Sequence, residues 1–154
     1  MKNILVVNVN WLGDVVFSTP VFQALKERYP QARLSCLALP RVTDVLKQVP
    51  WIDEIIVYDE KGYDRSLLGK LKLIFYLRSK SFDVVFLLHG SWTRALLVFL
   101  AGIPMRVGYD RKKRGWLLTH RVTMDQGVVH RSDSYLKVLE PLGITVNSRK
   151  TFLE

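Results

Sequence analysis

Short apolar runs alternate with longer amphipathic stretches along this chain. A continuous apolar run bounded by turn residues predicts a strand that is buried on both faces. Residues 4–7 form the first such run. The turn-forming residues Asn8, Asn10 and Gly13 follow it, and a helical pattern begins near Asp14. The chain therefore starts with a strand, a tight turn and a helix.

The same alternation continues through the remaining residues. It predicts strands at 4–7, 34–39, 54–58, 83–88, 105–109 and 121–124. It also predicts a first helix that ends near residue 28 and further helices at 41–49, 67–77, 91–101 and 132–142. In the helix at 67–77, we expect Leu67, Leu71, Ile74 and Leu77 to form the buried face. Strands that alternate with helices predict an α/β fold, with a parallel sheet, right-handed crossovers and helices on both faces.

Pro20 leaves two positions open for the start of the first helix. A proline inside a helix costs about 3 kcal/mol, so it is expected near a helix start. In one solution Ser18 or Thr19 is the N-cap and Pro20 is the first helical residue. In the other, the helix begins at 13–14 and contains Pro20 within its first two turns.

The turn after the first strand is the best candidate for a functional site, because open α/β sheets bind ligands at the carboxyl ends of their strands. It has neither the three glycines of a dinucleotide fingerprint nor the Gly-Lys-Ser/Thr of a P-loop. Asp14 is its reactive group, although an aspartate at a helix start is more often a cap or a dipole partner. We expect Asn10 to line a site here. Trp11 either stacks on a ligand or covers the sheet edge.

The end of the fourth strand should lie at the same sheet edge. There Gly90 permits close approach of a backbone, and Ser91 is a suitable N-cap for the next helix. His89 either contacts a ligand or forms a hydrogen bond with the backbone.

The chain is basic, with a formal net charge of +9 over 154 residues. Residues 106–131 contain seven lysines and arginines against two aspartates, and the densest part, 110–114, follows the fifth strand. Such a surface attracts nucleic acid, acidic lipid headgroups or a phosphorylated glycolipid, unless it is only a solubilising loop. Guanidinium groups bind carboxylate and phosphate in a bidentate manner, so Arg111 and Arg114 are expected to contact the ligand, and Lys112 and Lys113 to supply a general positive field. No aromatic stacking platform accompanies these charges, which disfavours nucleic acid.

The composition favours a soluble domain. The longest apolar stretch, 95–103, is about half of the ~20 residues that a membrane span needs, and no signal peptide precedes the first strand, so we expect a cytoplasmic protein. Cys36, the single cysteine, is expected in the core. His120 and His130 have no neighbours at metal-ligand spacing, so no metal site is expected.

An ordered set of motifs runs along nearly the whole chain: Trp-Leu-Gly-Asp at 11–14, Ser-Thr-Pro at 18–20, Arg-Tyr-Pro at 28–30, Ala-Gly-Ile-Pro at 101–104, Arg106, Gly-Tyr at 108–109, Leu-Leu-Thr at 117–119, His130, Tyr-Leu at 135–136 and Leu-Gly-Ile at 142–144. In this set the chain resembles glycosyltransferase family 9, which includes the ADP-heptose:lipopolysaccharide heptosyltransferases.

The resemblance implies the amino-terminal half of a two-domain GT-B enzyme. Residues 1–154 would be one Rossmann-like, acceptor-side domain, and the carboxy-terminal domain that holds the nucleotide sugar would be absent. The isolated chain is therefore expected to be inactive. No cofactor is implied, since ADP-heptose is a substrate bound mainly by the other domain.

The resemblance also assigns roles to the candidate residues. Asp14 matches the general base of an inverting transfer of heptose from ADP-heptose to the lipopolysaccharide inner core. The implied acceptor carries Kdo or heptose and phosphate, and lies at the inner face of the cytoplasmic membrane. Its expected contacts are Asn10, Trp11, Gly13, His89, Gly90, Arg111 and Arg114, whereas His130 matches a family position without an assigned role. A stand-alone nucleotide-binding module and, less favoured, a basic nucleic-acid-binding domain are the alternatives.

Overall fold

A parallel sheet forms the centre of the protein in the computed structural model, which describes residues 1–111, 113–123 and 131–144. The order of its six strands is β3-β2-β1-β4-β5-β6, and every neighbouring pair is parallel. The strands are β1 (Asn3–Val7), β2 (Arg33–Ala38), β3 (Glu54–Val57), β4 (Val84–Leu87), β5 (Met105–Tyr109) and β6 (His120–Val122). This is the strand order of the Rossmann fold. The predicted α/β class is confirmed.

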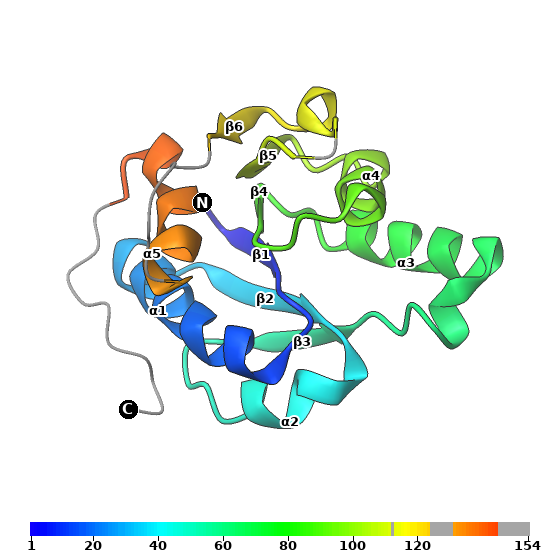
Figure 1. The fold of residues 1–154 in the computed structure, drawn as a ribbon, viewed down its shortest axis with the longest axis horizontal. Coiled ribbons are helices and arrows are strands. Elements are labelled where there is room, and N and C mark those ends of the chain that lie inside the picture. The colour runs from blue at the N-terminus through cyan, green and yellow to red at the C-terminus, as the bar shows by residue number, and fades with distance from the viewer. Residues whose placement is uncertain (112, 124–130, 145–154) are drawn as a thin grey trace.

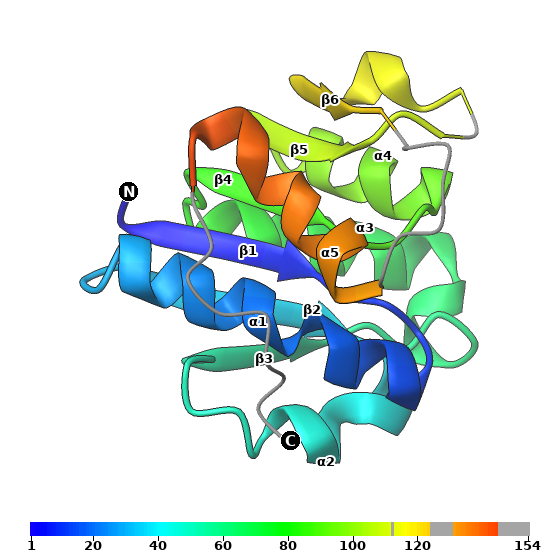
Figure 2. The same cartoon turned by 60° about the vertical axis from the view of Figure 1, so that its left-hand side comes forward.

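Helices cover both faces of the sheet (Figures 1 and 2). They are α1 (Leu12–Arg28), α2 (Thr43–Leu46), α3 (Leu67–Ser79), α4 (Trp92–Leu100) and α5 (Arg131–Leu136), with 3-10 turns at Pro40–Val42, Tyr63–Arg65, Gly115–Leu117 and Lys137–Leu142. Alternate residues of β1 face opposite layers: Ile4 and Val6 pack with α1 and α5, whereas Leu5 and Val7 pack with α3 and α4. In the part of the chain that the structure describes, no helix is long and apolar enough to cross a membrane.

Helix α1 begins at Leu12 and continues through Pro20. The alternative that started the helix at Pro20 is therefore wrong. Proline has no N–H to donate to the carbonyl four residues earlier, that of Val16. The hydroxyl of Thr19 takes that place and donates to the Val16 carbonyl at 2.8 Å, and the hydroxyl of Ser18 donates to the Val15 carbonyl at 2.6 Å. These two hydroxyls explain how the helix accommodates an internal proline.

Two other details of the sequence prediction are corrected. The helix expected at 41–49 is only the short α2 at Thr43–Leu46, since Pro40 opens a 3-10 turn before it. In α3, Ile74 and Leu77 are buried as expected, but Leu67 and Leu71 are exposed. Helix α3 carries apolar residues on two sides, and the side centred on Leu73, Ile74 and Leu77 is the one that packs on the sheet.

Cys36 lies on β2 in the core, as predicted, with no exposed surface. Burial raises the pKa of its thiol from 9.0 to about 12, although a hydrogen bond from Asn8 acts in the opposite direction. A thiol with such a pKa is unreactive at neutral pH.

Candidate functional site

A cleft of about 480 Å³ opens at the carboxyl edge of the sheet, between the loops that follow β1 and β4. These two strands are neighbours, but the chain leaves them toward opposite sides of the sheet, so their loops diverge. This is the switch point at which open α/β sheets bind ligands. The cleft is lined by Val9, Asn10, Trp11, Asp14, Leu88, His89, Gly90, Arg111, Ser134 and Tyr135.

Most of the residues predicted for the site meet in this cleft. Six of them line it, namely Asn10, Trp11, Asp14, His89, Gly90 and Arg111. Gly13 and Arg114 do not. Gly13 is exposed in the first turn of α1, and a Cβ atom built there would have no neighbour within 4 Å, so packing does not require glycine at this position.

Asp14 is half-buried in the first turn of α1. The unpaired N–H groups and the dipole of a helix start stabilise an anion at this position. The side chain of the N-cap residue, Trp11, supplies no hydrogen bond to them. The carboxylate of Asp14 is thus held at the positive end of a helix and at the wall of the cleft. Both interpretations of Asp14, as a dipole partner and as a base, are compatible with this position.

Trp11 projects at the mouth of the cleft and is 64% exposed. The guanidinium carbon of Arg41 lies 4.9 Å from the centroid of its ring. A ring this exposed covers little of the sheet edge, which favours the ligand-stacking interpretation. The arginine on one side of the ring fixes its orientation through a cation–π contact.

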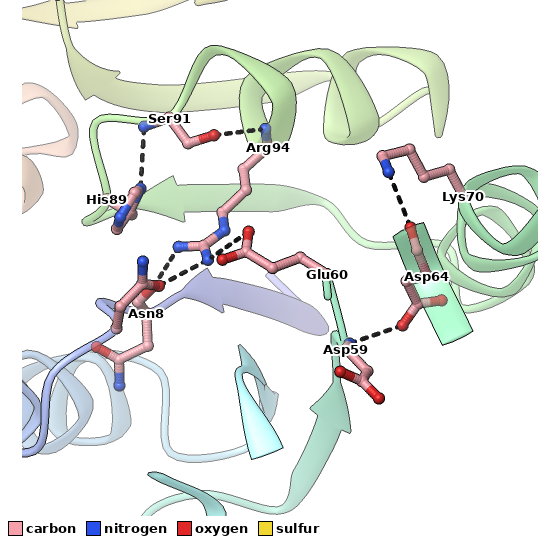
Figure 3. A network of polar contacts seen from close by, with 9 residues as sticks. Asn8, Asp59, Glu60, Asp64, Lys70, His89, Ser91 and Arg94 are labelled. Carbon is pink, nitrogen blue, oxygen red and sulfur yellow. Dashed lines mark hydrogen bonds and ion pairs between the residues drawn. The ribbon is translucent and has the colours of Figure 1, made fainter. Parts of the chain in front are cut away.

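The loop after β1 is held from behind by Arg94, a residue that the sequence analysis did not select (Figure 3). Its side chain is only 3% exposed. The guanidinium donates to Oδ1 of Asn10 at 2.6 Å and to the backbone carbonyl of Asn8 at 3.4 Å, and it pairs with Glu60 at 3.4 Å. Burial lowers the pKa of Arg94, and Glu60 acts against this shift. A lone arginine on the buried side of an otherwise apolar helix was the sequence feature that could have identified it.

Asn8 and Asn10 have different functions in this loop. Asn8 is buried, and its side-chain oxygen accepts the N–H of Val9 at 2.8 Å, so it shapes the chain as it leaves β1. Asn10 lines the cleft, and its oxygen is occupied by Arg94. The amide nitrogen of Asn10 can consequently act as a donor to a ligand in the cleft.

His89 combines the two interpretations that the sequence left open. Its Nδ1 accepts the N–H of Ser91 at 3.0 Å, so it is bonded to the backbone, and it also lines the cleft. Because Nδ1 acts as an acceptor, the neutral ring carries its proton on Nε2. The hydroxyl of Ser91 accepts the N–H of Arg94 at 3.3 Å, which confirms the predicted N-cap of α4.

Arg114 does not reach the cleft, and its predicted contact with a ligand is corrected. Its side chain is fully buried and donates to the carbonyls of Tyr109, His89 and Ser91 at 2.8–3.1 Å. The N–H of Arg114 donates to the carbonyl of Arg111 at 3.0 Å, and a 3-10 turn begins at Gly115. Burial and the nearby charge of Arg111 lower its pKa to about 10, and Asp110 acts against this. Arg114 therefore joins the loops after β4 and β5.

Arg111 is exposed and lies against Gly90, where a built Cβ atom would be 3.5 Å from its Cδ and Nη1 atoms. It presents the positive charge of the basic loop to the cleft. Lys113 is also exposed. Lys112 and His130 lie outside the described residues.

Ser134 and Tyr135 close the cleft from α5 and were not predicted for the site. The hydroxyl of Tyr109 donates to the Ser134 carbonyl at 2.6 Å and so fixes α5 to the end of β5. Nothing in the residue types indicated this placement, although Tyr135 belongs to one of the motifs. Among residues 1–111, 113–123 and 131–144, no group of three or more His, Cys, Asp or Glu side chains could hold a metal ion.

These groups define the chemistry that the cleft can support. Its walls offer a carboxylate, amide and imidazole donors, an aromatic ring and a guanidinium group. A polar ligand with hydroxyl groups and negative charge fits this set best. Asp14 is the one lining carboxylate that can accept a proton from such a ligand.

Comparison with known proteins places these features in context. The model of glycosyltransferase family 9 (heptosyltransferase) matches residues 70–151, more than half of the chain. Lipopolysaccharide heptosyltransferase 2 of Escherichia coli (strain K12) is 33% identical over 124 residues, which are 80% of this chain and 35% of that protein. The chain therefore spans about a third of the length of this curated relative.

Solved structures agree with this result. A glycosyl transferase family 9 protein from Veillonella parvula DSM 2008 superposes with a TM-score of 0.83 and 27% identity, and the match covers 98% of this chain and 44% of that one. The Escherichia coli ADP-heptose lps heptosyltransferase II gives a TM-score of 0.75 and 29% identity, with coverage of 90% and 40%.

Proposed function

Since the chain belongs to glycosyltransferase family 9, we propose that it is the acceptor-binding domain of an inverting enzyme that transfers heptose from ADP-heptose to the lipopolysaccharide inner core. One observation carries this proposal: Asp14 lies in the cleft at the switch point of the sheet, together with the hydrogen-bonding and cationic groups that an acidic sugar requires.

In the proposed reaction, the carboxylate of Asp14 takes the proton from a hydroxyl of the acceptor sugar. The hydroxyl oxygen forms a bond to the anomeric carbon of heptose, and the bond from that carbon to the ADP phosphate breaks. ADP leaves with the electron pair, from the face opposite the attack, so the configuration inverts. A helix start stabilises carboxylate and makes it a weaker base, but exclusion of water on closure against a second domain offsets this effect.

The charges around the cleft match the proposed acceptor. Its inner-core sugars carry carboxylate and phosphate groups, which a guanidinium group binds with two parallel hydrogen bonds. Arg111 is placed for such a contact at the wall of the cleft. The amide of Asn10, the Nε2–H of His89 and the ring of Trp11 would bind sugar hydroxyls and the apolar face of a sugar ring.

The donor requires a partner domain. The chain spans 35% of the first relative's length, and the turn after β1 has neither the three glycines of a dinucleotide fingerprint nor the Gly-Lys-Ser/Thr of a P-loop. The proposal therefore assigns ADP-heptose to a carboxy-terminal domain, and places the enzyme in the cytoplasm at the inner face of the cytoplasmic membrane.

An NMR titration tests the binding half of the proposal. The chain is titrated with a soluble Kdo-containing core oligosaccharide and, separately, with ADP-heptose. We expect shifts at Asn10, Asp14 and Arg111 with the oligosaccharide and little change with ADP-heptose. Tight binding of the nucleotide sugar without any response to the oligosaccharide would favour a nucleotide-binding module instead.

The Asp14→Asn variant tests the catalytic half. It is nearly isosteric, so it should bind the core oligosaccharide within about threefold of the unmodified chain. In an enzyme that joins this chain to a donor-binding domain, it should lower turnover by at least about 10²-fold, the range of general-base catalysis. Near-normal turnover would remove Asp14 from the role of base.

A further inference from the structure

The outward surface of the α3–α4 layer is unusually apolar for a face that no other helix or strand of the described residues covers. Helix α3 exposes Leu67, Leu68, Leu71 and Phe75, at 75%, 64%, 40% and 65%. Residues 67, 71 and 75 follow one another at four-residue spacing and so lie along one side of the helix. This side faces away from the sheet, since Leu73, Ile74 and Leu77 occupy the packed side.

A second exposed apolar group, made of aromatic rings, lies on the neighbouring helix and the 3-10 turn beside it. Trp92 and Phe99 of α4 are partly exposed, and the ring of Trp116 packs on both, with centroid distances of 6.4 and 5.9 Å. Helices α3 and α4 contact each other on the same face of the sheet, on the side away from α1 and α5 (Figure 1). We call the surface formed by Leu67, Leu68, Leu71, Phe75, Trp92, Phe99 and Trp116 the α3–α4 face.

Cations predominate at the border of this face. Helix α3 contains no acidic residue. Exposed cations stand before it at Lys61 and Arg65, and within it at Lys72 and Arg78. Two acidic groups of the preceding loop are engaged elsewhere: Asp64 is buried and accepts the N–H of Asp59, and Glu60 pairs with Arg94. The side chain of Asp59 is half-buried.

We propose that the α3–α4 face docks the protein on an anionic phospholipid bilayer. Exposed leucine, phenylalanine and tryptophan side chains bordered by lysine and arginine are the pattern of a helix that lies in the membrane interface. Lipid tails accept the apolar side chains, and anionic headgroups accept the cations. A second copy of this chain fits less well, because two such faces would bring like charges together.

One end of the α3–α4 face lies close to the cleft, which relates the proposed docking to the site. Ser91 caps α4 directly after His89 and Gly90, which line the cleft, so the amino-terminal end of α4 adjoins the site. Docking through this face would hold the mouth of the cleft beside the bilayer surface. This consequence rests on the proposed function, since it assumes an acceptor that is anchored in lipid; the docking itself does not.

Vesicle co-sedimentation tests the proposal. The chain is mixed with vesicles of phosphatidylethanolamine and phosphatidylglycerol, and with vesicles of phosphatidylcholine alone, none of which contains acceptor or donor. We expect binding to the anionic vesicles, weaker binding to the neutral ones, and a decrease with added salt.

Two sets of variants locate the surface. The Leu68→Ser/Phe75→Ser double variant should lose affinity for the anionic vesicles by about tenfold or more, because two apolar side chains no longer enter the bilayer. Lys72→Gln/Arg78→Gln should weaken binding to anionic vesicles and leave binding to neutral ones unchanged. Val57→Ser is the matched control and should bind vesicles like the unmodified chain, since Val57 is 47% exposed but lies on the edge strand β3, where its neighbour Ile56 is the residue that faces the α3–α4 layer.

Other results would overturn the proposal. Unchanged vesicle binding by the Leu68→Ser/Phe75→Ser variant would place the membrane-binding surface elsewhere. Absence of vesicle binding, together with self-association that the same variant abolishes, would make the face an interface between copies. If the chain neither binds vesicles nor self-associates, the α3–α4 face does not bind a bilayer and the proposal is wrong. Circular dichroism of each variant verifies that the fold is retained. A failure of acceptor binding in the NMR titration would contradict the proposed function but not the docking.

Discussion

Arg94 is expected to be the residue whose loss most disturbs the loop that carries Asn10 and Asp14. The Arg94→Met variant keeps most of the aliphatic stem and removes the guanidinium group. The cation–π contact with the ring of Tyr58, whose centroid lies 5.6 Å from the guanidinium carbon, is lost. Three polar interactions are lost with it: the 2.6 Å hydrogen bond to Asn10, the 3.4 Å bond to the Asn8 carbonyl and the 3.4 Å ion pair with Glu60. The short bond to Asn10 should dominate, because the other two are at the limit of hydrogen-bond distance.

The magnitude follows from the burial of each partner. Breaking a buried ion pair costs roughly 3–5 kcal/mol, because the remaining partner stays buried as an uncompensated charge. Here the remaining partner, Glu60, has a side chain that is 33% exposed and can be hydrated. The variant also avoids the cost of burying a charged guanidinium, a cost seen in the lowered pKa of Arg94. We therefore expect a loss of about 2 kcal/mol in the free energy of unfolding, close to the value of one hydrogen bond to a charged group.

Urea unfolding followed by circular dichroism measures this loss, with an unchanged m-value as the sign that the folded state is retained. Arg78→Met is the matched control, since Arg78 is an exposed arginine on the adjacent helix, and it should change stability by no more than about 0.5 kcal/mol. In the NMR titration, Arg94→Met should also weaken binding of the core oligosaccharide by roughly five- to tenfold, the value of one misplaced hydrogen bond.

A double-mutant cycle decides whether the bond to Asn10 is responsible. If it is, Arg94→Met and Asn10→Ala should be coupled by about 1 kcal/mol or more. Effects that add within about 0.3–0.5 kcal/mol would show that the two residues act independently. That outcome, or a loss in Arg94→Met no larger than in the control, would refute the positioning function of Arg94.

Two further predictions concern ionisable groups away from the cleft. Hydrogen bonds from the backbone N–H groups of Asn3 and Lys2, at 2.9 and 2.8 Å, lower the pKa of Asp83 below 3.8. The contribution of Asp83 to stability is therefore present above pH 3.8 and is lost as the pH falls toward the lower pKa of the folded state. In urea unfolding at several pH values, the stability of Asp83→Asn should depend less on acid pH than that of the unmodified chain. Burial raises the pKa of Cys36 from 9.0 to about 12, so the free energy of unfolding should decline as the pH rises above 9.0. At neutral pH the thiol should react with Ellman's reagent only as fast as the protein unfolds. Rapid labelling of the folded protein would contradict the burial of Cys36.

The sequence predicted the strands, and most of the residues that meet in the cleft, for a local reason. Buried parallel strands are continuous apolar runs, and their carboxyl ends meet at one edge. Residues that closely follow the runs at 4–7 and 83–88, such as Asn10 and His89, therefore had to lie near each other if the two strands were neighbours. The strand order itself depends on crossovers between distant segments, so the pairing of β1 with β4 came only from the structure.

The errors arose where a residue's environment is built from distant parts of the chain. Arg111 and Arg114 belong to one basic loop, yet one lines the cleft and the other is buried under carbonyls from two loops. Local sequence cannot separate them. Likewise, α3 has two apolar sides that satisfy the helical period, and only the packing of the sheet decides which one is buried.

The two buried arginines suggest how the cleft combines rigidity with affinity for anions. Arg94 holds the loop after β1, and Arg114 joins the loops after β4 and β5, so three loops are fixed by guanidinium groups behind the walls of the cleft. Arg114 contacts carbonyls and forms no ion pair among the described residues, and its Nη2 has no hydrogen-bond partner there. Burying such a charge lowers stability, as the pKa of about 10 indicates. An anionic ligand beside Arg111 would relieve the repulsion between the two arginines, and binding of the acidic sugar should therefore stabilise the fold more than binding of a neutral sugar with the same hydroxyl groups.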